Sequence, residues 1–146
     1  MKLQIASRIA IYALLELAAK PDQQVSVAEI GEKYRISSHH LAKVMKVLAR
    51  EGLVRSVRGA GGGSQFSGNA RRVTLLDVIA LFENVGSEDD RGKPGETTDE
   101  GRVLRHILDE IDDIARATFG SITIATMLKL LERQRRDRRR GAAGHG

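Results

Sequence analysis

Residues 25–63 read VSVAEIGEKYRISSHHLAKVMKVLAREGLVRSVRGAGGG, and this stretch decides the fold. Two short helical patterns are separated by a tight turn, the second helix has a basic face, and a basic ribbon with a glycine-rich tip follows. This order is typical of a winged helix-turn-helix, in which one helix enters the major groove of DNA and the ribbon, or wing, contacts the DNA beside it. The stretch therefore predicts a DNA-binding regulator.

Capping signals give the helix boundaries within this stretch. Ser26 and Glu29 have the spacing of a capping box, which predicts that a helix opens there and continues to Tyr34. Ser37 is the expected N-cap of the next helix, and Gly52 lies where a C-terminal cap belongs. An earlier helix is predicted by the apolar stripe over residues 3–19, which ends before a proline.

The second half of the chain predicts further helices. Thr74 with Asp77 is expected to open a helix over residues 75–85, and Thr123 is expected to cap a last helix after a break at Gly120. The predicted domains are a winged helix-turn-helix DNA-binding domain over 1–85, a flexible acidic loop over 86–101, dimerisation helices over 102–132 and a basic disordered tail over 133–146. The fold class is therefore mainly α with a small β-hairpin wing and a long C-terminal dimerisation helix.

Composition restricts the chemistry available to this chain. It has 146 residues and no cysteine, which excludes disulfides, thiol nucleophiles and any zinc or iron–sulfur site built on cysteine. Aromatic residues make up 3% of the chain, so we expect an aliphatic core. The sequence contains no membrane-spanning run and no signal-peptide pattern, which predicts a cytoplasmic protein. Because it has no cysteine to hold a cluster, no cofactor is predicted.

Charge is distributed unevenly along the chain. Residues 1–75 carry 12 Lys and Arg against 5 Asp and Glu, residues 76–115 carry 4 against 12, and residues 116–146 carry 8 against 2. A basic front segment is the pattern expected for phosphate binding, so double-stranded DNA is the predicted partner. The acidic middle segment should face away from the DNA or contact another part of the protein. The arginine-rich end could add non-specific DNA affinity or could be a solvated extension.

The helix after Ser37 has two chemically different faces. At 100° per residue, one face is apolar (Leu41, Val44, Met45, Leu48) and the other is a basic ridge (His39, Lys43, Lys46, Arg50). Recognition helices contact bases mainly through their N-terminal residues, which nominates Ser38, His39, His40 and Lys43 for base contacts and Lys46 and Arg50 for phosphates. An ordinary solvated face is the alternative for the ridge, and packing beside the preceding helix is the alternative for His40.

The wing is expected directly after this helix. Its parts are a strand over 53–57, a mobile tip over 59–63 and a weak return strand over 64–66. We expect Arg55 and Arg58 to project to the same face of the ribbon. Gly59 follows Arg58 and would let the backbone approach DNA closely, so that Arg58 could enter the minor groove. A solvent-exposed hairpin charge is the alternative.

Four segments resemble one known family: MKLQIASRIAIYALLELA (1–18), ISSHHLAKV (36–44), LAREGLVRSVRGAGGG (48–63) and SITIATMLKLLE (121–132). Together they resemble the winged helix-turn-helix transcriptional regulators of the NsrR/IscR type. The resemblance implies a homodimer in which long helices, here about residues 102–119, pair across a two-fold axis. It also implies binding to a pseudo-palindromic operator, usually to repress genes.

This chain departs from that family in three places. Many members hold an iron–sulfur cluster with three cysteines in the loop before the long helix, whereas residues 87–103 contain none. An aromatic residue usually follows the wing glycines, but Ser64 stands here. Some members use a carboxylate near the start of the first helix as a ligand, and here that stretch reads Ala6, Ser7, Arg8. His106 matches a ligating histidine of certain relatives, but we expect it to be an exposed surface residue.

Two other functional classes compete with a DNA-binding regulator. An enzyme with a phosphate-binding glycine loop needs a helix directly after the glycines, and SQFSGNARR predicts none. No informative grouping of His, Asp and Ser appears either, so no enzyme is predicted. The second rival is a protein-interaction adaptor that kept the fold but lost specific DNA binding.

Overall fold

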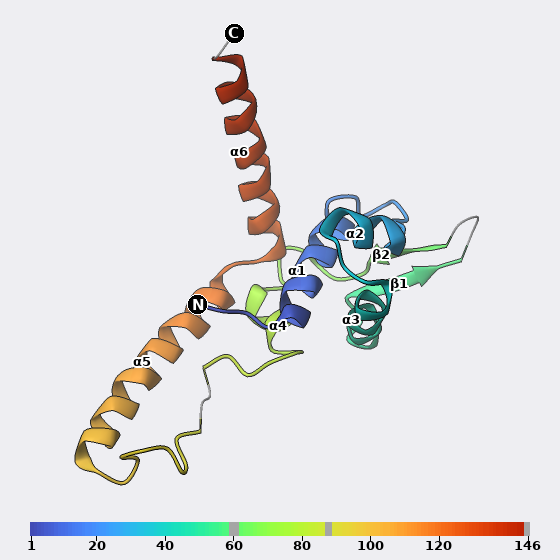
Figure 1. Cartoon of the computed structure of the whole chain (residues 1–146). Coiled ribbons are helices and arrows are strands. Elements are labelled where there is room, and N and C mark those ends of the chain that lie inside the picture. Colours follow the sequence, from blue (N-terminus) through green and yellow to red (C-terminus); the bar gives the residue numbers. More distant parts are fainter. Residues whose placement is uncertain (59–61, 87–88, 145–146) are drawn as a thin grey trace.

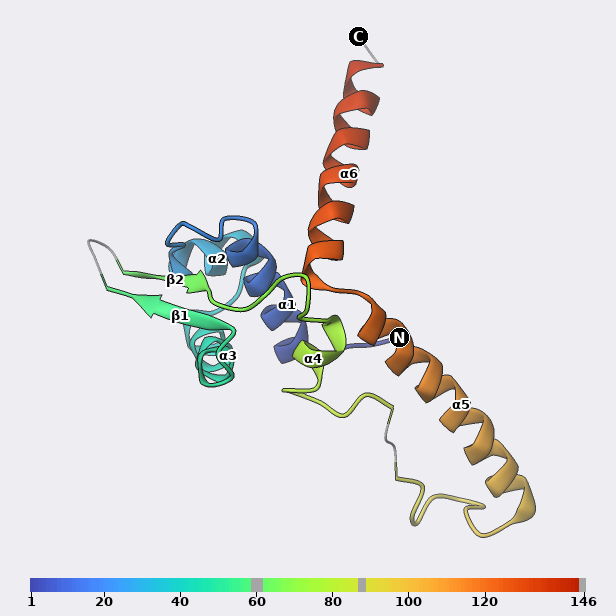
Figure 2. The same cartoon turned by 180° about the vertical axis from the view of Figure 1, so that it is seen from behind.

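The chain folds into six helices and one β-hairpin over residues 1–58, 62–86 and 89–144, which are the residues that the computed structural model describes. The elements are α1 (Ile5–Ala18), α2 (Val27–Tyr34), α3 (Ser38–Arg50), β1 (Val54–Val57), β2 (Gly63–Phe66), α4 (Leu75–Ile79), α5 (Asp99–Ser121) and α6 (Ile124–Ala143). Helices α1 to α4 pack with the hairpin, and α5 and α6 project from this unit in different directions (Figures 1 and 2). The predicted fold class is confirmed.

Helix α1 forms the centre of the core. Leu14 and Leu17 are completely buried, and α1 contacts α3, α4, β2 and the start of α6. From α3, the whole predicted apolar face is buried, and Leu48 is inaccessible to solvent. Phe66 is the single buried aromatic residue among those described, so the core is aliphatic as predicted. The core holds α3 by one face and leaves its other face at the surface.

The helix caps confirm some predictions and correct one. The Ser37 hydroxyl accepts a hydrogen bond of 3.2 Å from the His40 amide, and Gly52 takes a positive φ of 76° after α3. Ser26, by contrast, makes no capping hydrogen bond through its side chain, so the predicted capping box is wrong. The neighbouring Val25 is fixed to Ser64 by two backbone hydrogen bonds of 2.9 Å, and this pairing sets the entry to α2.

The hairpin is antiparallel, with the register Val54 to Phe66, Arg55 to Gln65, Ser56 to Ser64 and Val57 to Gly63. Val54 and Phe66 are buried at its base. The return strand is one residue longer than predicted, because Gly63 pairs with Val57. Val25 forms a further bridge to Ser64. Most of the predicted mobile tip, residues 59–61, lies outside the described residues.

Helix α4 is shorter than the sequence predicts. Its capping box forms, with Asp77 N donating to Thr74 Oγ1 at 3.1 Å and Thr74 N donating to Asp77 Oδ2 at 2.9 Å. The helix ends at Ile79 instead of continuing to residue 85. Beyond it, Glu83 turns back to α1, where its carboxylate accepts a hydrogen bond of 2.6 Å from the buried Ser7 hydroxyl. Between Ile79 and Glu83 the backbone tightens, because the Leu81 and Phe82 amides donate three residues back, to the Val78 and Ile79 carbonyl oxygens at 3.2 and 3.0 Å.

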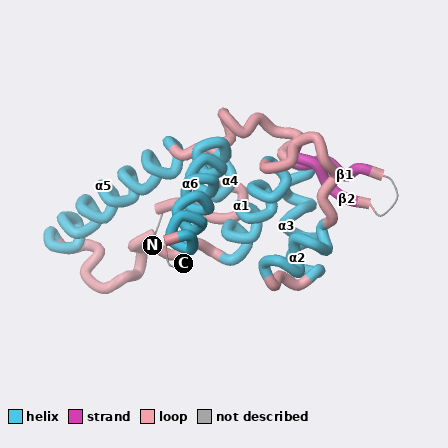
Figure 3. The backbone as a smooth tube through the Cα atoms, turned by 90° about the horizontal axis from the view of Figure 1, so that it is seen from above, coloured by secondary structure: helices cyan, strands magenta, loops and turns pink. Residues whose placement is uncertain are grey.

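The last two helices are longer than the sequence predicts. Helix α5 continues through Gly120, which was expected to break it, and α6 extends to Ala143. The described part of the predicted disordered tail is therefore helical, which agrees with the high helix propensity of arginine, glutamine and alanine. Seen from above, α5 and the hairpin lie on opposite sides of α6 (Figure 3). Within the described parts of the chain, no helix is both long and apolar enough to cross a bilayer.

Candidate nucleic-acid interface

Helix α3 presents its predicted basic ridge to solvent. The exposed residues are Ser38, His39, Lys43, Lys46 and Arg50, and the opposite face is buried against α1. Among the described residues, His39, Lys43 and Lys46 form no ion pair, whereas Arg50 lies 3.9 Å from Glu51. The ridge is therefore positive, largely uncompensated and accessible. Its contact with DNA stays a prediction.

His40 differs from its neighbour His39. His39 is exposed, whereas His40 is half-buried, and its amide is used for the Ser37 cap. The burial agrees with the alternative that His40 packs at the side of the helix. Base contact by His40 stays a prediction.

The turn between α2 and α3 depends on two backbone features. Arg35 adopts a left-handed conformation with a φ of 54°, and the Ile36 amide donates to the Gly31 carbonyl at 2.8 Å. A Cβ on Gly31 would lie 3.1 Å from the Ile36 carbonyl oxygen, so the turn closes tightly over this glycine. Sequence reasoning missed Gly31, although a glycine near the end of a short helix is a recognised stop signal.

The two wing arginines, Arg55 and Arg58, differ in position: Arg55 lies on β1 and Arg58 lies just beyond its end. Arg55 is exposed on β1, and its guanidinium donates to Gln65 Oε1 on β2 at 2.9 and 3.2 Å. Arg58 is exposed just beyond the end of β1. The expectation that both project to the same face is wrong, because side chains alternate along a strand and these positions are three residues apart. Gly59 lies outside the described residues.

The tip-side end of the hairpin strands is attached to the chain before α2. Gln24 Nε2 donates to the Val57 carbonyl oxygen at 3.2 Å. A Cβ on Gly63 would lie 2.5 Å from Gln24 Cγ and 2.9 Å from the Val25 carbonyl oxygen, so only glycine fits here without movement. These contacts position Arg58 relative to α3. Sequence reasoning missed Gln24, whose partner is 33 residues away.

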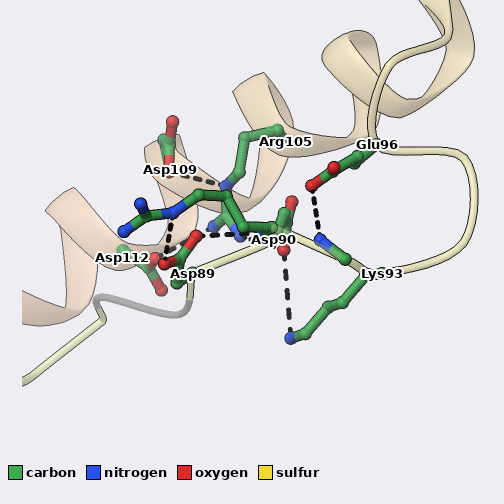
Figure 4. Close-up of polar contacts among 9 residues, drawn as sticks. Asp89, Asp90, Lys93, Glu96, Arg105, Asp109 and Asp112 are labelled. Carbon is green, nitrogen blue, oxygen red and sulfur yellow. Dashed lines mark hydrogen bonds and ion pairs between the residues drawn. The ribbon is translucent and has the colours of Figure 1, made fainter.

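A second polar cluster lies far from α3, where the segment before α5 meets that helix. Arg105 is its centre, with ion pairs to Asp90 at 3.1 Å, Asp109 at 2.9 Å and Asp112 at 3.3 Å (Figure 4). Its side chain is only 22% exposed. The i, i+4 spacing of Arg105 and Asp109 was visible in the sequence, but the contact with Asp90 was not. The cluster fastens the acidic segment to α5.

Proteins of similar sequence are transcriptional regulators by name. BadM of Rhodopseudomonas palustris, an HTH-type transcriptional regulator by name, is 48% identical over 144 residues, which are 99% of this chain and 92% of that protein. IscR of Xenorhabdus nematophila, also an HTH-type transcriptional regulator by name, is 32% identical over 153 residues, covering 99% of this chain and 93% of IscR. Two solved structures share the fold: oxidised CymR of Staphylococcus aureus (TM-score 0.73, 26% identity, 88% of this chain and 96% of that one) and T. potens IscR (TM-score 0.69, 27% identity, 92% and 90%).

The residues of this chain do not fit an iron–sulfur cluster. The sequence contains no cysteine, and the guanidinium of Arg105 occupies the junction between the acidic segment and α5. Over residues 1–58, 62–86 and 89–144, no three His, Asp or Glu side chains form a group that could hold a metal ion. His106 is exposed and lies 3.2 Å from Glu110. The described residues therefore provide no ligand set for an iron–sulfur cluster.

The family assignment rests on nearly the whole chain. The sequence model of the Rrf2 family, described as iron-dependent transcriptional regulators, matches residues 3–130. These residues include the helix-turn-helix, the wing, the long α5 and the start of α6. The related proteins are transcriptional regulators and not enzymes. The chain belongs to the Rrf2 family of transcriptional regulators.

Proposed function

We propose that this protein is a homodimeric, sequence-specific DNA-binding repressor that recognises a pseudo-palindromic operator. The observation that carries the proposal is the exposed basic ridge of α3, which has a buried apolar face behind it and the wing beside it. The names of the related proteins support DNA-binding regulation, and the family resemblance supports repression. No cofactor takes part in the proposed function.

The two ends of the ridge have different proposed roles. Ser38, His39 and Lys43 lie on the first half of α3, which in helix-turn-helix proteins contacts base edges. Lys46 and Arg50 lie further along and hold phosphates, which adds affinity without sequence preference. Arg55 and Arg58 extend the contact along the DNA from the wing.

An apolar stripe on α5 supports the homodimer. Helix α5 has no buried residue, although its stripe consists of large apolar side chains that are 48–67% exposed (Val103, Leu104, Ile107, Ile111, Ile114). A continuous apolar face of this kind on a soluble regulator indicates a partner. Pairing two α5 helices about a two-fold axis would present two α3 helices to half-sites about 34 Å apart, one turn of B-form DNA.

Operator binding tests the proposal directly. Genomic fragments selected by the purified protein would give an operator, and fluorescence anisotropy would then compare it with random duplex over a salt titration. We expect a steep loss of affinity with salt. Lys43→Ala should reduce the discrimination between operator and random duplex by about 1–3 kcal/mol, the contribution of one good base contact.

The matched control is Lys129→Ala, which removes an exposed lysine from α6, away from α3 (Figure 1). It should leave the discrimination unchanged. Weak binding without sequence preference in the parent protein would contradict the proposal and favour a protein-interaction adaptor. Equal effects of the two variants would contradict the assignment of α3 as the reading helix.

A further inference from the structure

An open groove of about 660 Å³ lies between α1, α2 and the first half of α6. Its floor is apolar, because Leu15 and Ala18 of α1 are buried there and Met127, Leu128 and Leu131 of α6 are half-buried. Sites for small organic molecules typically measure about 300–1,000 Å³ and are mostly apolar. The groove therefore has the size and lining of such a site.

Two tyrosines give the groove a flat wall. The rings of Tyr12 and Tyr34 stack with their centroids 4.7 Å apart and an angle of 7° between their planes. The Tyr34 hydroxyl donates to Glu16 Oε1 at 2.5 Å, and Lys33 donates to the same oxygen. These bonds fix the wall before any ligand arrives. Lys33 Nζ lies over the Tyr34 ring, 5.3 Å from its centroid. A planar apolar group would therefore pack against Tyr12 in this wall, with little loss of side-chain entropy.

The rim of the groove is cationic. The rim includes three cations, Lys20, Lys33 and Arg135. It includes two carboxylates, Glu16 and Glu132. Lys33 is paired with Glu16. Within the described parts of the chain, Lys20 and Arg135 form no ion pair. A negatively charged group above the apolar floor would therefore meet two cations that form no close ion pair, Lys20 from the end of α1 and Arg135 from α6.

We propose that this groove binds a small organic anion with a flat, apolar body. The body lies against the tyrosine wall and the α6 side chains, and the anionic group lies between Lys20 and Arg135. Because α2 precedes the recognition helix and α6 follows α5, the bound anion would fix α6 relative to the helix-turn-helix and change operator affinity. This last consequence rests on the proposed DNA-binding function, whereas the binding site does not.

The full-length protein can be titrated with the fluorescent anion 8-anilinonaphthalene-1-sulfonate. N-phenyl-1-naphthylamine, which lacks the sulfonate, is the uncharged counterpart. We expect saturable binding of the sulfonate at one site per chain. The double variant Lys20→Gln/Arg135→Gln should weaken it by roughly tenfold, as expected for two partly exposed charge-assisted contacts. Binding of the uncharged dye should not change. Arg138→Gln, outside the groove, is the matched control.

The exposed apolar face of α5 could also bind the dye, so the site must be located. The chain has three methionines, and Met127 is the one that lines the groove. In protein labelled with ¹³C at the methionine methyl groups, the Met127 signal should shift during the titration. An unshifted Met127 signal would contradict the assignment of the binding site to this groove. An unchanged affinity for the sulfonate in the double variant would contradict it as well.

Operator binding tests the coupling separately. Saturation with the sulfonate should change the operator Kd of the parent by a few-fold or more, the usual size of an allosteric effect, and should not change that of the double variant. An unchanged Kd with the groove occupied would overturn the coupling alone. If the dye binds in the groove but no operator exists, the proposed DNA-binding function fails and the binding site stands.

Discussion

Glu16 of α1 receives hydrogen bonds from two side chains of α2, Lys33 and Tyr34. Burial by itself would raise the pKa of Glu16, but the bonds from Lys33 and Tyr34 and the charge of Lys33 outweigh it and hold the pKa below the ordinary 4.5. Burial, and next the bond to Glu16, raises the pKa of Tyr34. One carboxylate therefore fastens α2, the first helix of the helix-turn-helix, to the core.

This bond should make the fold sensitive to acid. Because the folded state lowers the pKa of Glu16, its stabilisation is complete above pH 4.5 and is lost as the pH falls through the folded pKa. Glu16→Gln should lower the free energy of unfolding by about 1–2 kcal/mol at neutral pH, measured by urea denaturation. The difference from the parent should shrink below pH 4.5. Glu29→Gln, which changes an exposed residue of α2, is the control. A difference in unfolding free energy between Glu16→Gln and the parent that stays constant with pH would contradict this account.

The two wing arginines should differ in their effect on DNA binding. Arg55 is held by Gln65, whereas Arg58 lies at the strand end, where its side chain can enter the minor groove. Arg58→Ala should reduce the slope of log Kd against log salt by about one, and its loss of affinity should be largest on operators with A·T-rich flanks. Anisotropy on duplexes that differ only in their flanks measures this. Equal losses of affinity on operators with A·T-rich and G·C-rich flanks would contradict minor-groove entry by Arg58. The same dependence on the flanks in Arg55→Ala would contradict the difference between the two arginines.

At the scale of the elements, the segment before α5 is held on that helix by a cap, a close backbone contact and ion pairs. Thr98 Oγ1 accepts from the Gly101 amide at 3.0 Å, and a Cβ on Gly101 would lie 2.0 Å from the Gly95 carbonyl oxygen. The preceding segment therefore packs directly on the first turn of α5. Arg105 then neutralises carboxylates from both, so that a highly acidic region can fold back on itself.

Removing Arg105 should release this segment. Arg105→Gln leaves Asp90, Asp109 and Asp112 without their shared cation, and like-charge repulsion should open the segment. Hydrogen exchange of residues 89–98 should become faster, while exchange in α3 stays unchanged. Arg138→Gln, which removes an exposed arginine from α6, is the control. In the parent, an iron chelator should change neither this exchange nor operator binding. A response to the chelator would show that a metal, and not Arg105, holds the segment.

At the level of the whole molecule, α5 and α6 leave the DNA-binding unit without covering each other (Figures 1 and 2). A monomer would leave the α5 stripe in water. Pairing through this stripe would remove it from water and would place two ridges on one duplex. The proposed repressor therefore depends on assembly as much as on the residues of α3.

A charge in the α5 stripe should separate the subunits. Ile107→Glu would have to bury an unpaired carboxylate in the dimer, which is strongly unfavourable. Sedimentation analysis should show monomers, and operator affinity should fall by at least about 100-fold as two-site binding is lost. His106→Glu introduces the same charge at a neighbouring exposed position that pairs with Glu110, and it should leave the dimer intact. A dimeric Ile107→Glu protein would place the interface elsewhere.

The sequence by itself determined the features that depend on local periodicity and capping. The apolar and basic faces of α3, the caps at Ser37, Thr74 and Thr123 and the hairpin all follow from side chains within a few residues of one another. The absence of cysteine excluded cysteine-held metal clusters in the same direct way. These features needed no knowledge of the rest of the chain, because helix and strand geometry fix which neighbours share a face.

Only the tertiary structure decided the features that join distant segments. Glu83 contacts Ser7 across 76 residues and joins the segment after α4 to α1. Val25 pairs with Ser64 before α2, and Tyr34 meets Glu16 to build one wall of the groove. No local pattern encodes such contacts, since they form only when packing of the core brings the segments together. Arg105 shows the same limit, because its pair with Asp109 was readable from helical spacing and its pair with Asp90 was not.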